Sequence, residues 1–340
     1  MRPSFDPRLI NGPFDDPGLY IPFVYQNRAM LFDLGDLGAL TSRELLKITH
    51  VFVTHTHMDH FIGFDRLLRL NLGRERSLHL FGPEGFLKNV EGKLAGYAWN
   101  LVSNYDRSLS LSVTEMRAGE LLRTRYLCKN RFRRQAEIDA RPFRGTLYEE
   151  PGLRVSAVEL DHGIACLGFS IEERFHVNIR KDGLSALGLQ PGPWLQDFKH
   201  ALYAKAGPQT VISADRVGTD RPATFHLGEL AEEIALITAG QKVSYIVDAG
   251  FSRTNVDTIV NFVQNADRLF IEAAFLDEDA DIALAKNHLT ARQAGMIAGW
   301  AGVANFCVFH YSPRYMERAE QLEAEAKRGC EASYRNPRKD

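Results

Sequence analysis

Short apolar runs bounded by Gly, Pro and Asp recur along the chain, and they alternate with segments of helical periodicity. The runs have the length of buried strands, whereas the helical segments repeat apolar residues every three or four positions. Strands mixed with such helices indicate an α/β protein whose sheets are covered by helices. We expect strands at 29–36, 48–55, 77–83, 153–162, 242–250, 268–275 and 305–313, and helices at 61–70, 84–98, 228–239, 254–265 and 289–302.

Two segments depart from this rhythm, so we predict one domain over 1–340 with excursions at about 115–150 and 172–215. Within the first, residues 123–144 carry eight Lys/Arg and two Asp/Glu, a net charge of +6. This stretch either contacts nucleic acid through phosphates or is a solvated surface. The polar tail from about 327 is expected to fray. The candidates for stacking on bases in the basic stretch are Tyr126, Phe132 and Phe143.

Composition limits the partners and the cellular compartment that we expect for the protein. The 340 residues carry a formal net charge of −2, so any affinity for nucleic acid must come from a local patch. The four cysteines are far apart and form no C-x-x-C pair, which favours reduced thiols. The first residues contain no apolar signal region, and no run approaches the ~20 apolar residues of a membrane span. We therefore expect a cytoplasmic protein that does not enter a membrane.

The densest chemistry lies in "THTHMDH", which directly follows an expected strand. Imidazole and carboxylate groups are ligands for zinc and similar divalent ions. On an extended chain, His55 and His57 point to the same side, so one ion can take both. Asp59 and His60 follow where the chain turns into a helix, which aims them at a second position. A single ion needs three or four protein ligands, so the surplus itself indicates two ions.

Three further candidates each follow an apolar strand: His162, Asp248 and His310. A lone His or Asp at such a position is usually a cap or turn residue. Ligands at the ends of several strands, however, are how an α/β scaffold builds a rigid polar site. We interpret these three side chains as completing the site begun by the histidine motif.

The motif and the segments after it resemble the metallo-β-lactamase superfamily, and in particular its ribonuclease Z branch, the tRNA 3′-processing endonucleases. The resemblance extends from about residue 29 to 316. It departs from the family after Asp33, where "GDLGAL" stands in place of a Gly-Glu-Gly-Thr-Gln run. The segments that carry it are "FVTHTHMDHFIGFDRLLR", "LFGPEGF", "LDHGIACLGFSIEE", "GLQPGPWLQDFK", "IEAAF" with "NHLTARQAG", and "FHYSPRY".

The resemblance implies a four-layer αββα sandwich of metallo-β-lactamase type and two divalent metal ions, zinc above iron or manganese. It also implies a homodimer. Asp33 would brace the metal loop, and Glu272 would orient His288, which would protonate the leaving oxygen. A histidine that opens a helix usually serves only the local structure. The role of His288 as proton donor is therefore an implication of the resemblance. The implied metal ligands are His55, His57 and His162 for one ion, Asp59, His60 and His310 for the other, and Asp248 between them.

These residues suit phosphodiester cleavage, because two divalent ions activate water and neutralise charge on a phosphoryl group. Asp59 could also accept a proton from the nucleophile. The leading expectation is a metal-dependent endonuclease acting on precursor tRNA 3′ trailers. The same site supports a hydrolase for a small phosphodiester, lactone or thioester, since fold does not settle substrate. A binding protein that kept the fold without catalysis is the third reading.

Overall fold

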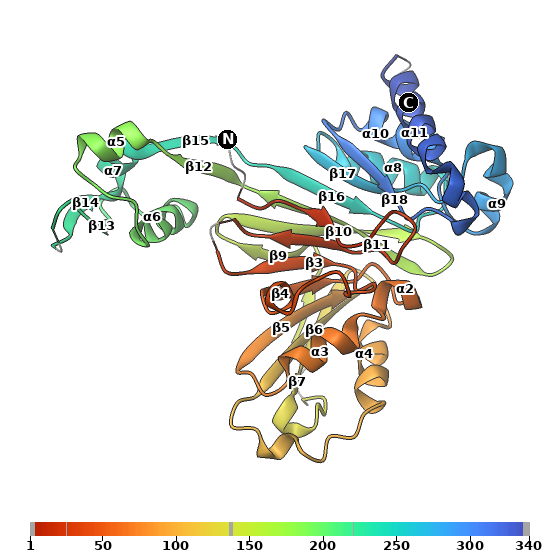
Figure 1. The fold of residues 1–340 in the computed structure, drawn as a ribbon, viewed down its shortest axis with the longest axis horizontal. Coiled ribbons are helices and arrows are strands. Elements are labelled where there is room, and N and C mark those ends of the chain that lie inside the picture. The colour runs from red at the N-terminus through yellow and green to blue at the C-terminus, as the bar shows by residue number, and fades with distance from the viewer. Residues whose placement is uncertain (1–3, 25, 136–138, 220, 336–340) are drawn as a thin grey trace. The chain divides into compact units, whose positions relative to one another are not determined.

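The computed structural model describes residues 4–24, 26–135, 139–219 and 221–335. These residues form two compact units (Figure 1). The larger contains Phe5–Leu147, Ser156–Ser170 and the chain from Lys242 onward, and the smaller contains Tyr148–Val155 and Ile171–Gln241. No helix among the described residues combines the length and apolar character needed to span a lipid bilayer.

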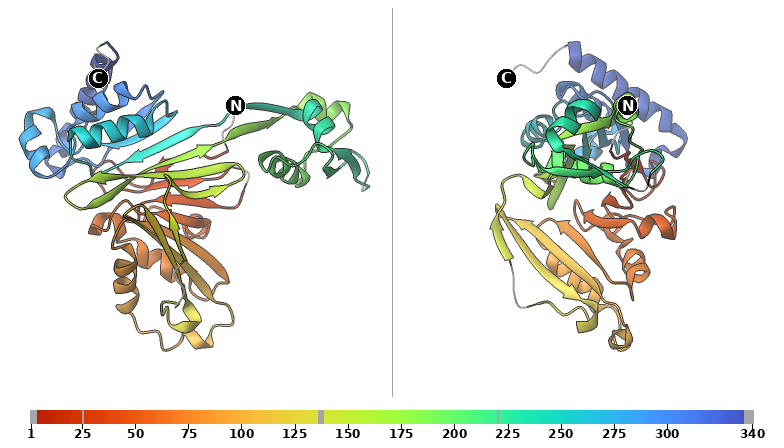
Figure 2. Two further views of the ribbon diagram at one scale, coloured as in Figure 1. Left: turned by 180° about the vertical axis from the view of Figure 1, so that it is seen from behind. Right: turned by 90° about the vertical axis from the view of Figure 1, so that its left-hand side faces the viewer.

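The first sheet of the larger unit has eight strands that follow one another in chain order. The strands β3 to β6 run parallel and the outer strands pair antiparallel, so the sheet is mixed. Its residues Val51, Leu80 and Val113 belong to a core that also contains Leu67 and Val90 of two helices. These helices cover one face of the sheet (Figures 1 and 2). The strands are β1 (Arg8–Leu9), β2 (Leu19–Pro22), β3 (Ala29–Phe32), β4 (Ile48–Phe52), β5 (Arg76–Gly82), β6 (Leu109–Arg117), β7 (Glu120–Leu127) and β8 (Asp139–Pro142).

The second sheet has six strands in the order β18-β17-β16-β11-β10-β9. Its apolar residues pack against four helices to form a second core. Between the two sheets, the ring of Phe169 packs on Phe32 and Phe52. The larger unit thus has four layers, helix, sheet, sheet and helix, which confirms the predicted fold class. The strands are β9 (Thr146–Glu150), β10 (Leu153–Asp161), β11 (Ala165–Glu173), β16 (Lys242–Ile246), β17 (Arg268–Glu272) and β18 (Phe306–Phe309).

Two groups of helices cover the sheets of the larger unit. On the first sheet lie α1 (Ser42–Leu45), α2 (Met58–Phe61), α3 (Phe64–Asn71) and α4 (Phe86–Ala95), with the short turns η1 (Val102–Asn104) and η2 (Cys128–Asn130). With the second sheet belong α8 (Arg253–Val263), η3 (Asp277–Asp279), α9 (Ala280–Ala285), α10 (Ala291–Trp300), η4 (Pro313–Arg318) and α11 (Ala319–Arg335).

The smaller unit is built from two strand pairs and three helices around its own apolar core. Trp194, in the Gly-Pro segment singled out above, is buried in that core, and its ring lies 6.4 Å from that of Phe198. Its role in the described structure is therefore packing. The elements are β12 (Phe175–Ile179), β13 (Val211–Ala214), β14 (Ala223–His226), β15 (Ala235–Ala239), α5 (Lys181–Ala186), α6 (Trp194–Tyr203) and α7 (Leu227–Ile234).

All seven predicted strands are present, but the helix predicted over 228–239 is only half right. Helix α7 ends at Ile234, and the following residues form β15, which pairs antiparallel with β12. Pairing with a distant strand overrides the helical periodicity there, because "ALITA" also suits a strand. The tail from about 327, which was expected to fray, is helical as far as Arg335, where α11 ends, and residues 336–340 lie outside the described part of the chain.

The basic stretch contains the strand β7, which pairs along its length with β6. Two aromatic rings proposed above for stacking on bases are in fact core residues. Tyr126 is fully buried and donates a hydrogen bond to Glu91, and Phe132 packs edge-on against Trp99. Both are unable to reach a base without unfolding this part of the sheet. Residues 136–138 of the stretch lie outside the described part of the chain.

Candidate metal centre

The predicted ligands come together in the larger unit because each follows the end of a strand. Strand β4 ends just before the histidine motif, β10 just before His162, β16 shortly before Asp248 and β18 just before His310. Within each of three groups, the atoms that could hold an ion lie within 4.8 Å of one another. The groups are His55, His57, His162 and Asp248; Asp59, His60 and His310; and Asp248, Glu272, His288 and His310.

Asp248 lies at the centre of this arrangement. Its Oδ2 is 3.4 Å from the Nε2 atoms of His55, His60 and His162. Its Oδ1 is 3.1 Å from Nδ1 of His310. The Asp248 carboxylate therefore contacts histidines of both predicted metal groups, which is where a bridging ligand has to lie.

Several buried polar atoms in the centre make no hydrogen bond with the described residues. They are His55 Nε2, His60 Nε2, Asp248 Oδ1 and His310 Nδ1. Buried polar atoms are nearly always satisfied, so four such atoms converging on one point need an explanation. A divalent cation supplies one, since it binds imidazole nitrogens and carboxylate oxygens at once. The donor set therefore fits metal ions.

In His60 and His162, the second ring nitrogen, Nδ1, already has a hydrogen-bond partner. Nδ1 of His60 lies 2.9 Å from Oδ2 of Asp33, and Nδ1 of His162 lies 2.8 Å from the carbonyl oxygen of Asn287. Histidines that bind metals usually donate their second N–H to a carboxylate or carbonyl, which fixes the ring and its tautomer. Both rings thus present Nε2 to the centre of the site.

Three residues of the centre have a backbone that L-amino acids rarely adopt. The φ angles of Asp33, Asp248 and His310 are 59°, 54° and 60°. This left-handed conformation turns the chain sharply where each strand ends. Such residues cost about 1–3 kcal/mol each and persist when the surrounding structure holds them, typically at functional sites.

Charge and burial divide the histidines into two kinds. Burial lowers the pKa values of His55, His57 and His162, so their rings are neutral and offer lone pairs. Burial also opposes charge on His60, but Asp248 and Asp33 outweigh it and raise the pKa of His60 to about 10, so an ion that binds this ring has to displace a proton from it. Burial likewise opposes charge on Asp59, yet the hydrogen bond from His310 and the nearby imidazolium charges lower the pKa of Asp59 to about 2.

Glu272 and His288 form a buried pair beside the metal groups. Oε2 of Glu272 is 2.8 Å from Nδ1 of His288, and Oε1 accepts a hydrogen bond from the backbone N–H of Ala249. Burial lowers the pKa of His288, but the charge of Glu272 and this hydrogen bond have the larger combined effect and raise it. The reciprocal attraction of His288 lowers the pKa of Glu272 against the effect of burial. Both shifts therefore favour a carboxylate on Glu272 beside an imidazolium on His288.

Two supporting residues were not anticipated from the sequence. The hydroxyl of Tyr245 donates to Oδ2 of Asp33 at 3.0 Å. The side chain of Asn255 donates to the carbonyl oxygens of Asp161 and Gly250 and accepts from the N–H of Asp161. Asn255 thereby ties together the loops that carry His162 and Asp248. The only signal in the sequence is that Tyr245 stands three positions before Asp248.

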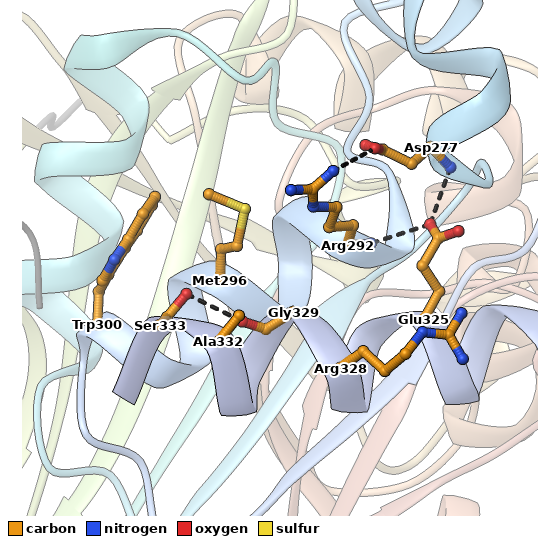
Figure 3. A pocket seen from close by; sticks show the side chains of 9 residues that line it. All are labelled: Asp277, Arg292, Met296, Trp300, Glu325, Arg328, Gly329, Ala332 and Ser333. Atoms are coloured by element: carbon orange, nitrogen blue, oxygen red, sulfur yellow. Dashed lines mark hydrogen bonds and ion pairs between the residues drawn. The ribbon is translucent and has the colours of Figure 1, made fainter. Parts of the chain in front are cut away.

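Contacts of Asp277 hold the chain at the start of α10, directly after His288, and Figure 3 shows those with Arg292 and Glu325. Asp277 accepts hydrogen bonds from the Thr290 hydroxyl at 3.2 Å and from Arg292 at 3.0 Å. Glu325 of α11 accepts from the N–H of Asp277 at 2.8 Å. A groove of about 490 Å³ runs beside these contacts between α10 and α11. None of the histidines of the metal groups lines it, so its contacts support the His288 loop from outside.

Known proteins of similar sequence cover most of the chain. Over 291 residues, the chain is 32% identical to the ribonuclease Z of Deinococcus radiodurans, covering 85% of this chain and 83% of that protein. It is 28% identical over 327 residues to the ribonuclease Z of Archaeoglobus fulgidus, covering 92% and 87%. No protein-family model matches the sequence.

Solved structures give the same picture of the fold. A metallo-β-lactamase fold protein of Bacillus subtilis superposes with a TM-score of 0.53 at 15% identity, covering 95% of this chain and 93% of that one. A long-form ribonuclease Z from yeast superposes with a TM-score of 0.52 at 14% identity, over 92% of this chain and 38% of the larger protein. At identities this low, the superpositions show similarity of fold alone.

Proposed function

The chain belongs to the ribonuclease Z family of metallo-β-lactamase fold proteins, and we propose that it is an endonuclease that removes 3′ trailers from precursor tRNA. The family relationship and the convergence of seven candidate ligands on one centre together support this proposal. The observation that carries it is the buried Glu272–His288 pair beside that centre, because a hydrolase that expels a poor leaving group needs a proton donor there.

We propose that the centre holds two divalent ions, zinc in the first instance. His55, His57 and His162 would hold one ion, and Asp59, His60 and His310 the other. Asp248 would contact both, which its distances to His55 and His60 support. Such ions activate water at neutral pH and neutralise charge that develops on the phosphoryl oxygens.

His288 is proposed as the proton donor to the leaving 3′ oxygen. Its Nδ1 is committed to Glu272, so the proton available to substrate is on Nε2. The side chain keeps 17% of its surface exposed, which leaves it accessible to a bound substrate. A positioned acid of this kind typically contributes about 10²–10⁴-fold to the rate.

Asp59 is proposed to accept a proton from the nucleophile as well as to bind metal. Its side chain is 42% exposed, far more than the other carboxylates of the centre, so it lies where water can enter. Its lowered pKa keeps it ionised over the neutral range. We also propose that the chain acts as a homodimer, which light scattering on the purified protein tests.

The deciding experiment compares three substrates with the purified, zinc-loaded protein. These are a tRNA with a 3′ trailer, bis(p-nitrophenyl)phosphate and a simple lactone. Cleavage of the trailer after the discriminator nucleotide supports the proposal. Activity on the lactone or the small phosphodiester without trailer cleavage would replace it with the small-molecule hydrolase, and activity unaffected by chelator would remove the metal centre from the mechanism.

A further inference from the structure

We infer that Tyr245 is a positioning residue for the metal centre, acting from the second sheet on an aspartate of the first. The inference rests on the proposed metal centre but not on the identity of the substrate. Tyr245 lies in β16 and is fully buried, and it is 212 residues away in sequence from Asp33, the residue to which it donates.

The carboxylate of Asp33 is held by donors from three residues. Thr54 donates its N–H to Oδ1 at 2.7 Å, and its hydroxyl lies 2.9 Å from the same atom. Oδ2 is 2.9 Å from His60 Nδ1 and 3.0 Å from the Tyr245 hydroxyl. Tyr245 and the candidate metal ligand His60 therefore share one carboxylate oxygen. Because Asp33 has no exposed surface, its oxygens depend on these donors for hydrogen bonds that water would otherwise supply.

The ring of Tyr245 also packs beside two of the strained strand ends. Its centroid is 5.9 Å from that of Phe32, which precedes Asp33, and 5.4 Å from that of Phe309, which precedes His310. Asp33 and His310 are two of the three residues of the centre with positive φ. One buried side chain thus contacts the residue before each of these turns.

These contacts give the hydroxyl a role that differs from general packing. It fixes the Asp33 carboxylate, which in turn fixes the His60 ring and directs Nε2 toward the centre. Partners of this kind, one step removed from the metal, typically change metal affinity about 10- to 100-fold when lost. Substituting Tyr245 by Phe retains the ring and its packing and removes the O–H alone.

The test measures zinc binding to Tyr245→Phe by competition with a chromogenic chelator. We expect zinc affinity to fall about 10- to 100-fold for the weaker-bound ion. Tyr126→Phe is the matched control, since Tyr126 is equally buried and donates to the carboxylate of Glu91 at 2.9 Å, in a core outside the metal groups. The control should lose thermal stability but bind zinc as the wild type does.

Equal zinc affinity in Tyr245→Phe and wild type would overturn the inference and leave Tyr245 a packing residue. A second measurement places Tyr245→Phe in an Asp33→Asn background. If the hydroxyl acts through Asp33, the second substitution should weaken zinc binding little further, and independent losses that add in full would also overturn it. Failure of the wild type itself to bind zinc would instead refute the proposed metal centre.

Discussion

Nδ1 of His288 lies 2.8 Å from Oε2 of Glu272, a carboxylate with no exposed surface at the end of β17. The second oxygen of Glu272 is bound to the backbone N–H of Ala249, one residue after Asp248. The carboxylate that orients the proposed proton donor is thus attached to the strand end that carries the proposed bridging ligand. This single residue couples the geometry of proton transfer to that of the metal centre.

Replacing His288 by Ala should keep the bound zinc and remove most of the activity on RNA. We expect a loss of about 10²–10⁴-fold in kcat for trailer cleavage. The loss should be much smaller for bis(p-nitrophenyl)phosphate, because p-nitrophenolate leaves without a proton. Metal analysis and both kinetic assays on the same preparation test this. His288 also lies in one of the groups able to hold an ion, so loss of zinc in the variant would make it a ligand.

The pH dependence of kcat on RNA should change when Glu272 is replaced by Gln. Glu272 raises the pKa of His288, and a protonated donor loses activity as pH rises through that pKa. Removing the carboxylate charge lowers the pKa, so the alkaline limb of the profile should move to lower pH.

The Glu272–His288 pair should also make the stability of the fold depend on pH. A histidine whose folded pKa is raised stabilises the fold fully below its unfolded pKa of about 6.5, and this contribution disappears as pH rises through the folded pKa. Glu272 has a lowered pKa, so its own contribution is full only above its unfolded pKa of about 4.3. Denaturant titrations of wild type and Glu272→Gln should therefore differ most between about pH 4.3 and pH 6.5, where both charges of the pair contribute. In the kinetic experiment, an alkaline limb of kcat that stays at the same pH in Glu272→Gln would show that His288 is not the group that titrates there.

Neutralising Arg131 and Arg133 should raise KM for precursor tRNA and flatten its dependence on salt. Both arginines are exposed, whereas Arg134 is paired with Glu91 at 2.6 Å. Each lost phosphate contact should reduce the slope of log affinity against log salt by about 1. Arg134→Ala is the control and should change the slope less. An unchanged slope in the Arg131→Ala/Arg133→Ala variant would favour a solvated surface.

Removing metal should abolish hydrolysis and lower thermal stability together. Nε2 of His55, Nε2 of His60 and Oδ1 of Asp248 are buried and make no hydrogen bond with the described residues. A ligand that binds the folded state at 1,000 times its Kd adds about 4 kcal/mol of stability. Differential scanning fluorimetry of the chelated protein with added zinc, manganese or iron should give a rise in Tm. The ion that restores both Tm and activity identifies the metal, and no rise with any ion would contradict the assignment.

The sequence predicted the strands, and the structure brings the candidate ligand residues together, because both depend on local patterns. Strand ends such as those before His162 and His310 are visible as apolar runs that stop at a polar residue. Tyr245 and Asn255 were missed because their partners are 212 and 94 residues away, and neither residue differs locally from ordinary strand or helix sequence. The second half of 228–239 failed for a related reason, since only its distant partner strand makes it a strand.

The contact between Glu325 and the N–H of Asp277 has a consequence for biosynthesis. A ribosome makes the chain from the N-terminus, so His310, the last proposed metal ligand, emerges before α11 does. The nascent polypeptide therefore exposes all the proposed metal ligands before Glu325, one of the contacts that support the His288 loop, has left the ribosome. The proposed zinc ions could bind before this contact forms, and a message truncated between these points would encode the candidate ligands and the Glu272–His288 pair without the contact from Glu325.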